Sequence, residues 1–359
     1  MWCEKVFDYI CSRILILNFQ MFVKHYIFIF LIINSLTIFG QTPLVKRIGI
    51  IGLDTSHSPT FAAMFCGKDA NPEFADFRVP VAYPWGSKTI EEGYSRVPMF
   101  TERIQALGIK IAGSIEELLQ EVDFVLLETQ DGHIKVEQLL AVFKAGKPVF
   151  MDKPIAASLA DVCLIYELAE KYKVPAFTTS SFRYITPVLE VTSGRRGNVL
   201  GADCFGPCDE ELSHPSLYWY GIHGVEMLFS IMGTGCETVT RSHTPDTDLL
   251  VGIWKDARIG TYRGMRSGNN RYYHFGGFAY CARGPVKLDN YSDFGYPGLM
   301  NEVVNFFRTG IVPILPETTI EIYAFMDAST LSYQTGKPVK IDDVIREAKE
   351  TAKKNLETY

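Results

Sequence analysis

The chain has 359 residues, 47% of them hydrophobic and 21% charged, which is the composition of a globular protein long enough for two domains. This composition excludes a fibrous or disordered chain. The 41 acidic residues outnumber the 35 Lys and Arg residues, and the formal net charge of −6 disfavours non-specific binding to nucleic acid.

The first 40 residues have the pattern of an export signal. Lys24 precedes an apolar segment over residues 26–39, which is shorter than the roughly 20 apolar residues of a membrane-spanning helix. We therefore predict a signal peptide over residues 1–40 that starts at Met21, no stable membrane anchor, and a periplasmic or secreted protein. An uncleaved anchor or a buried N-terminal helix is the alternative. No twin arginine precedes the segment, which indicates export as an unfolded chain.

The cysteines and histidines show no metal-binding pattern. Six cysteines follow the N-terminal segment without C-x-x-C spacing, and the seven histidines of the chain are scattered. We therefore predict no metal site. Cys204 and Cys208 are near enough in sequence to pair in an oxidising compartment, but buried free thiols are the more common state of such residues.

Residues 46–179 alternate between short apolar runs and amphipathic segments. Most of the runs are apolar on both faces, as strands of a parallel sheet covered by helices are. The expected strands cover residues 46–52, 76–83, 122–129, 147–152 and 174–179, and the expected helices cover 114–122, 133–146 and 157–173. Ser114, with Glu117 three residues later, forms a capping box at the start of the first of these helices. The pattern predicts a doubly wound, Rossmann-like α/β domain that binds a dinucleotide.

Residues 180–359 have a different pattern. Aromatic and β-branched runs separated by Gly, Asn and Pro predict antiparallel strands. The expected strands cover residues 248–255, 257–264, 271–282 and 284–290, and helices are expected over 299–310, 320–336 and 342–359. We therefore predict an α+β domain for substrate binding and dimerisation, with a ligand site in the crevice at the carboxyl ends of the parallel strands.

The turn GLDTSH after the first strand keeps only the first glycine of the G-x-G-x-x-G dinucleotide motif. Gly52 supplies the tight turn, and the hydroxyls of Thr55 and Ser56 can hold a phosphate together with N–H groups at the helix start. Asp54, in the second glycine position, opposes a pyrophosphate unless it caps the helix and points away. His57 stands in the third glycine position. It implies either a wider gap between the helix and the strand or a side chain turned toward the ligand.

The end of the second strand leaves the choice of cofactor open. The segment AYPWGSK has no acidic residue to bind a ribose 2′-hydroxyl. Ser87 and Lys88 there favour a 2′-phosphate instead, as in NADP.

The segment AGKPVFMDKPIA, residues 145–156, resembles the AGKHVxxEKPxA signature of the Gfo/Idh/MocA oxidoreductases, the family of glucose–fructose oxidoreductase and inositol dehydrogenase. Lys153 and Pro154 match, and Asp152 replaces the usual glutamate. The resemblance implies that Lys153 lies between cofactor and substrate and hydrogen-bonds the hydroxyl that is oxidised. A partly desolvated lysine at the end of a parallel strand can have its pKa lowered enough for proton transfer.

Three further segments extend the resemblance along the chain. LLETQDGHIKVEQLLAVFKAGK is similar to the strand, loop and histidine-started helix of the family, with His133 at the histidine position. SSFRYITP is similar to its F-R-Y/F-x-P segment and supplies Arg183 and Tyr184. YWYGIHGVEMLFSIMG resembles the D-x-G-x-H-x-x-D helix, in which the histidine assists the lysine. His223 matches, whereas Trp219 stands at the aspartate position.

These matches define the predicted site. Lys153 is the predicted proton-transfer residue, and His223 is the general base or acid beside it, with a core histidine as the alternative. The predicted cofactor-binding residues are Gly52, Asp54, Thr55, Ser56, His57, Thr129, Gln130, His133, Asp152 and Lys153. The predicted substrate-binding residues are Arg183, Tyr184, Trp219 and Tyr220. The rings of residues 218–220 can pack against a sugar or, equally, against the sheet.

The sequence thus predicts an NAD(P)-dependent oxidoreductase that acts on a secondary hydroxyl of a sugar, polyol or glycoside. The choice between NAD and NADP stays open. A homo-oligomer that forms through the antiparallel sheet, as it does in relatives, is also left open. One alternative is a glycosidase or lyase that retains its NAD and returns the hydride. The other is a non-enzymatic carbohydrate-binding protein in which the cofactor site has decayed.

Overall fold

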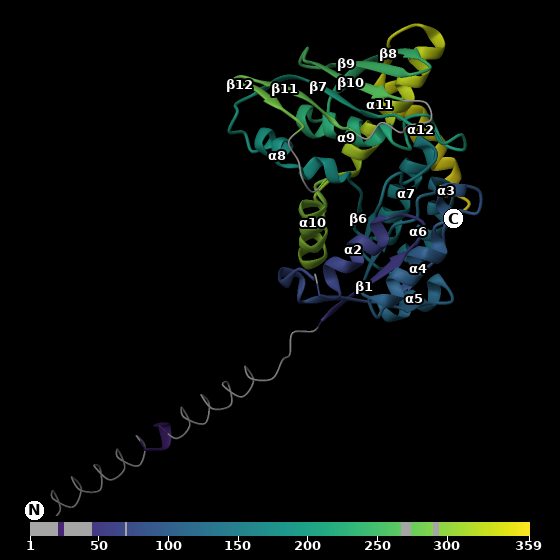
Figure 1. The fold of residues 1–359 in the computed structure, drawn as a ribbon, viewed down its shortest axis with the longest axis vertical. Helices are drawn as coiled ribbons and strands as arrows, with labels where there is room; N and C mark the ends of the chain where they lie inside the picture. Colours follow the sequence, from purple (N-terminus) through teal and green to yellow (C-terminus); the bar gives the residue numbers. More distant parts are fainter. Residues whose placement is uncertain (1–20, 25–44, 69, 267–273, 290–293) are drawn as a thin grey trace, which may run out of the picture. The chain divides into compact units, whose positions relative to one another are not determined.

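The computed structural model describes residues 21–24, 45–68, 70–266, 274–289 and 294–359 (Figure 1). The predicted signal peptide lies outside these residues except for a short helix over residues 21–24, so it stays a prediction. No helix in the described part of the chain is both long enough and apolar enough to cross a membrane. Cys204 and Cys208 are buried free thiols, as are most of the described cysteines.

The first sheet is parallel throughout, with the strand order β3-β2-β1-β4-β5-β6. Its strands are β1 (Lys46–Ile51), β2 (Phe77–Tyr83), β3 (Lys110–Ile111), β4 (Phe124–Leu127), β5 (Val149–Met151) and β6 (Ala176–Phe177). The order reverses between β1 and β4, which is where doubly wound folds bind their ligands. The predicted fold class is confirmed, and the five predicted strands are present together with the short β3.

Helices cover this sheet and connect its strands (Figure 1). They are α2 (His57–Phe65), α3 (Glu91–Tyr94), α4 (Val97–Ala106), α5 (Ile115–Glu121), α6 (Lys135–Lys144) and α7 (Leu159–Tyr172), with the 3₁₀ turns η1 (Pro72–Phe74), η2 (Gly132–Ile134) and η3 (Ser181–Tyr184). The predicted cap of α5 is confirmed, because Ser114 Oγ accepts the N–H of Glu117 at 3.1 Å. Glu117 in turn accepts the N–H of Gly113 rather than that of Ser114.

The second sheet has the order β12-β11-β7-β10-β9-β8-β13. Its strands are β7 (Val199–Pro207), β8 (Cys236–Thr244), β9 (Thr247–Trp254), β10 (Ile259–Met265), β11 (Gly276–Cys281), β12 (Gly284–Lys287) and β13 (Val339–Lys340). All neighbouring pairs are antiparallel except β7 with β10. The helices of this half are α8 (Thr186–Thr192), α9 (Gly221–Met232), α10 (Tyr296–Thr309), α11 (Pro316–Thr335) and α12 (Ile341–Leu356). Helices α9 and α11 pack on the sheet (Figure 1).

Helix α10 returns to the first sheet. Its buried residues Leu299, Met300 and Val303 share one hydrophobic cluster with Ile48 and Ile50 of β1. Residues 46–359 accordingly form one compact unit. The predicted division of this unit at residue 180 stays a prediction.

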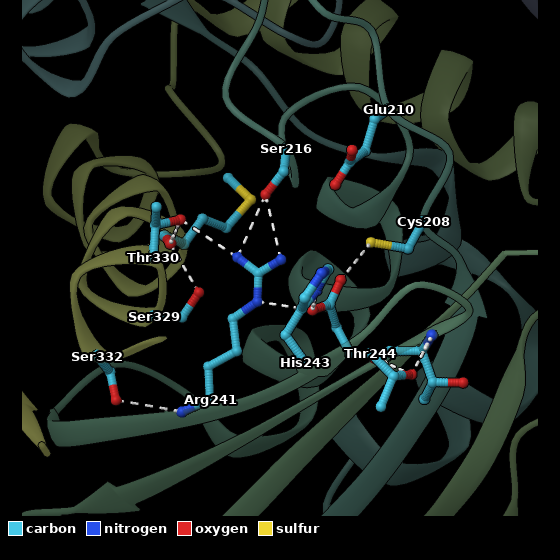
Figure 2. Close-up of polar contacts among 12 residues, drawn as sticks. Cys208, Glu210, Ser216, Arg241, His243, Thr244, Ser329, Thr330 and Ser332 are labelled. Atoms are coloured by element: carbon cyan, nitrogen blue, oxygen red, sulfur yellow. Dashed lines mark hydrogen bonds and ion pairs between the residues drawn. The ribbon is translucent and has the colours of Figure 1, made fainter. Parts of the chain in front are cut away.

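A buried ionic cluster holds the loop between β7 and α9 (Figure 2). Asp248 on β9 is fully buried, and its carboxylate accepts from Arg241 Nε and from His243 Nδ1, each at 2.7 Å. Arg241 NH1 donates to Ser216 Oγ in the loop at 3.2 Å, and Cys208 Sγ lies 3.5 Å from Asp248 Oδ2. Because buried charges of this kind are stable only when paired, the cluster fixes the loop on the second sheet.

Candidate active site

The turn after β1 requires its glycine. Gly52 has φ +94°, and a Cβ atom there would clash with the backbone and side chain of Thr129, the second residue after β4. Glycine is the residue that both tolerates this φ and leaves room for the contact. The ends of β1 and β4, which flank the switch point, therefore approach each other closely.

Asp54 points into the protein and not toward the crevice. Its carboxylate is fully buried and accepts the N–H groups of Ser87, after β2, and Gln130, after β4, each at 3.1 Å. Burial raises the pKa of the Asp54 carboxyl to about 6, although these two N–H groups favour the charged form. The carboxylate points away from the phosphate position without capping α2, and it joins the loops that follow β1, β2 and β4.

Ser87 extends this junction. Its hydroxyl is buried and donates to Asp131 Oδ2 at 2.8 Å. The Ser87 side chain is thus buried and hydrogen-bonded between the loops. The Lys88 ammonium, in contrast, lies on the exposed side, 5.7 Å from the centre of the Trp85 ring. Of the two residues that suggested a 2′-phosphate, Lys88 is the one placed to contact it.

His57 fills the third glycine position and connects three elements. It begins α2, and its Nδ1 lies 2.7 Å from Asp152 Oδ2 at the end of β5. Its Nε2 lies 3.2 Å from the hydroxyl of Tyr296, at the start of α10. The imidazole therefore bridges α2 to β5 and α10, which explains how the helix packs there without the glycine.

The ends of β4 and β5 carry a buried cluster of charged groups. Glu128, Asp152 and Lys135 are buried, and Lys135 Nζ donates to the backbone oxygen of Asp152. Burial, together with the Asp152 charge, raises the pKa of Glu128 well above its ordinary value. Burial lowers the pKa of Lys135 to about 8. Burial also opposes ionisation of Asp152, but His57 and the two lysine charges beside it hold its pKa well below the usual range. Glu128 is therefore a neutral acid next to an ionised Asp152.

Lys153 and His223 face the same space. Lys153 Nζ lies 5.5 Å from the centre of the Tyr220 ring, and that ring lies 6.4 Å from the imidazole of His223. His223 Nδ1 is 2.7 Å from Ser180 Oγ. Burial, and then the charge of Lys153, lower the pKa of His223 well below its ordinary value, so the imidazole is neutral at neutral pH.

The predicted substrate residues occupy different environments. Arg183 pairs with Glu226, with 3.4 Å between NH2 and Oε1, and also donates to Thr179. Tyr184 is partly buried and packs against the core of the first sheet. Trp219 is 3% exposed, so its ring packs inside the protein. Tyr220 is the aromatic residue of this group whose ring lies beside Lys153.

The remaining predicted cofactor residues lie along the same loops. Thr55 is buried and Ser56 is exposed at the start of α2. Gln130 is buried, and its side-chain oxygen accepts from Arg96 at 2.7 Å. His133 lies in η2 with a half-exposed imidazole that contacts Asp131 and the ring of His214.

Sequence reasoning missed several residues of this region. The buried ammonium of Lys135, the neutral acid Glu128, Tyr296 and Ser180 all contact residues that were predicted for the site. Lys135 begins α6, two residues after the predicted His133, and no local signal in the sequence marks it as buried. Nothing in the sequence pattern places Tyr296 against α2, because the two are brought together by the return of α10.

A cavity of about 530 Å³ opens between the loops that follow β2 and β4. Trp85, Lys88, Asp131 and His133 are among its lining residues, and Ser213 from the loop between β7 and α9 lines it as well. It therefore lies where doubly wound folds hold the adenosine half of a dinucleotide.

Comparison with a family model concerns residues 46–180 of the chain. Residues 46–180 match the family model described as an oxidoreductase family with an NAD-binding Rossmann fold. The Rossmann segment of this chain is similar to the Gfo/Idh/MocA oxidoreductases. The predicted recognition, enzyme class and nicotinamide cofactor agree with this match. A search of curated protein sequences found no match.

Solved structures share the fold of the Gfo/Idh/MocA segment and of the second sheet. A probable dehydrogenase from Thermotoga maritima is 19% identical with a TM-score of 0.68, over 83% of this chain and 99% of that one. A putative myo-inositol dehydrogenase from Sinorhizobium meliloti 1021 is 14% identical with a TM-score of 0.64, over 82% and 99%. A scyllo-inositol dehydrogenase from Lactobacillus casei, with bound NAD(H) and scyllo-inositol, is 13% identical with a TM-score of 0.65, over 83% and 99%.

The residues of the Gfo/Idh/MocA segment fit a nicotinamide dinucleotide. The first turn of α2 carries no acidic side chain, and Asp54 is turned inward, so neither of these opposes a phosphate at that helix start. Two buried polar atoms beside the crevice, Thr129 Oγ1 and Trp85 Nε1, have no partner among the described residues, as is expected where a ligand supplies one.

Proposed function

We propose that the chain is an NAD(P)-dependent oxidoreductase that moves a hydride between the nicotinamide and a secondary hydroxyl of a sugar, polyol or glycoside. The observation that carries this proposal is the convergence of Lys153, Tyr220 and His223 at the carboxyl end of β5, in a Rossmann segment of an NAD-binding oxidoreductase family. The inositol dehydrogenases that share the fold act on cyclic polyols, which supports this substrate class.

Lys153 and His223 have different roles toward the substrate hydroxyl in this proposal. The Lys153 ammonium hydrogen-bonds the hydroxyl oxygen and stabilises the negative charge that develops on it. His223 is neutral, and with Nδ1 held by Ser180 its Nε2 accepts the hydroxyl proton. A bound nicotinamide supplies the hydride acceptor. The face of Tyr220, beside Lys153, offers an apolar surface to a sugar ring.

We propose that Gly52, the start of α2, and Trp85 and Lys88 of the cavity would hold the dinucleotide beside the Lys153 site. The Trp85 ring provides a stacking face for adenine, and Lys88 provides a cation for a 2′-phosphate. We therefore propose NADP as a cofactor at least as suitable as NAD. We also propose that the protein is exported to the periplasm or secreted, on the apolar segment over residues 26–39.

The test measures cofactor binding and turnover separately. Purified protein is denatured, any released small molecule is identified by mass spectrometry, and refolded protein is titrated with NAD(H) and NADP(H) by fluorescence. We expect dinucleotide binding that survives in Lys153→Ala, while turnover of polyols and sugars falls by about 100-fold or more. Lys144→Ala, on the exposed end of α6, is the matched control and keeps both properties.

Two results would contradict the proposal. If neither dinucleotide binds at millimolar concentration, the chain is a binding protein whose ligand has changed. If dinucleotide binds but Lys153→Ala turns over substrate as the unmodified protein does, the hydroxyl is activated elsewhere. A glycosidase that returns its hydride needs the same lysine and is recognised by glycoside cleavage without net reduction of the cofactor.

A further inference from the structure

Two histidines that are far apart in the sequence meet at the edge of the cavity between the β2 and β4 loops. His133 lies in η2, and His214 lies in the loop between β7 and α9. Their ring centres are 4.6 Å apart at an interplanar angle of 78°. Asp131 lies between them, with Oδ1 3.0 Å from His133 Nδ1 and 3.6 Å from His214 Nε2. One ligand atom from each of the three lies within 4.8 Å of the other two.

We propose that Asp131, His133 and His214 form a binding site for a divalent transition-metal ion of the zinc type, separate from the Lys153 site. Two imidazoles and one carboxylate are ligands that such ions prefer. Zinc bonds of about 2.0 to 2.1 Å place tetrahedral ligand atoms about 3.4 Å apart. The two distances from Asp131 Oδ1, 3.0 and 3.6 Å, lie on either side of this value, so small side-chain rotations bring the atoms into coordination.

Neighbouring groups already orient two of the ligands. Asp131 Oδ2 accepts from Ser87 Oγ at 2.8 Å, which leaves Oδ1 directed at the histidines. The side chain of His214 is fully buried, and its Nδ1 lies 3.0 Å from Ser213 Oγ, which directs Nε2 toward Asp131. Hydrogen bonds of this kind from outside the coordination sphere fix the orientation of metal ligands.

The fourth coordination position faces the cavity. Asp131, His133 and Ser213 all line it, so water or a ligand in the cavity can reach the ion. Two existing hydrogen bonds must be given up. The first joins His133 Nδ1 to Asp131 Oδ1 at 3.0 Å, and in the second the N–H of Gly132 donates to His214 Nε2 at 3.0 Å. A bound ion takes that lone pair and connects the β4 loop to the loop between β7 and α9. The Arg241–Asp248 cluster holds the second of these loops in place.

The experiment uses chelator-treated full-length protein without substrate or dinucleotide, so its result does not depend on the oxidoreductase proposal. Zn²⁺ is titrated by calorimetry, and Co²⁺ by its visible absorption, which reports coordination by nitrogen and oxygen. We expect one ion per chain and a rise in melting temperature of about 2 to 4 °C at saturation. The variants His133→Gln and His214→Gln should each lose about 100-fold or more in affinity.

The matched control is His243→Gln, since His243 contacts Asp248 in the cluster of Figure 2 and not Asp131. It should bind Zn²⁺ as the unmodified protein does. The proposal is overturned if neither ion binds in a one-to-one ratio at micromolar concentration, or if binding is unchanged in His133→Gln. His133 is half exposed, so that variant stays informative even if replacement of the buried His214 prevents folding.

Discussion

The substitution Lys135→Met tests the buried charge cluster at the ends of β4 and β5. The Lys135 ammonium is fully buried and donates to the backbone oxygen of Asp152. Methionine keeps a flexible apolar stem of similar length and removes the charge and the donor. The effect on stability follows from the pKa of the lysine, which burial lowers from 10.5 to about 8 despite the nearby carboxyls of Asp152, Glu128 and Asp54.

The sign of the pH dependence is fixed by which state binds more protons. Between the two pKa values the unfolded chain keeps the lysine proton and the folded chain has lost it, so the free energy of unfolding rises with pH. At about pH 7 the shift costs the folded protein about 3 kcal/mol, and at about pH 9.5 it costs about 1 kcal/mol. Wild-type protein should therefore gain about 2 kcal/mol over this interval relative to Lys135→Met.

Urea denaturation at several pH values measures the difference in unfolding free energy between the two proteins. At neutral pH the variant loses the hydrogen bond to Asp152 but also the buried charge, so we expect it to lie within about 2 kcal/mol of wild type. Lys144→Met, on the exposed end of the same helix, is the control and should follow wild type at every pH. A difference between wild type and Lys135→Met that does not change with pH would refute the reasoning.

Three other substitutions test separate parts of the structure. Arg241→Met removes a buried partner of Asp248 and should lower the free energy of unfolding by about 3 kcal/mol, measured in urea. Gly52→Ala places a Cβ where the backbone after β4 lies, so it should cost about 2 kcal/mol or more and abolish dinucleotide binding in the fluorescence titration. Ser180→Ala frees Nδ1 of His223, so the pH profile of kcat should shift while dinucleotide affinity stays unchanged.

Local patterns were sufficient for the first sheet and for much of the second. Apolar runs, a capped helix start and the glycine turn are short-range signals, and the elements they predict are present. Strand β7 escaped prediction because its sequence, VLGADCFGP, contains two glycines and a proline and does not alternate in polarity. The site was harder to predict from the sequence than the sheets. A lysine at the start of a helix normally extends into solvent, and nothing local marks Lys135 as buried.

The contacts that define the site cross the fold. His57 meets Asp152 and Tyr296 because three separate elements converge, and His133 meets His214 because a loop of the second sheet reaches the first. The sequence prediction of no metal site rested on spacing, whereas the metal site proposed above uses ligands that come together across the fold and leave no spacing signal. The sequence indicated which residues belong to the site. It did not indicate which side chains they contact, because those contacts depend on tertiary structure.

The two departures from the glycine motif are parts of one arrangement. Asp54 satisfies the backbone N–H groups of Ser87 and Gln130, which a glycine in its place would leave without these acceptors inside the protein. His57 holds α2 against β5 and α10, where a glycine would leave space. A glycine turn shapes a cofactor site through close backbone approach, whereas this turn is held by side-chain hydrogen bonds to four neighbouring segments. Replacing either residue alone would therefore disturb the loops that the other one depends on.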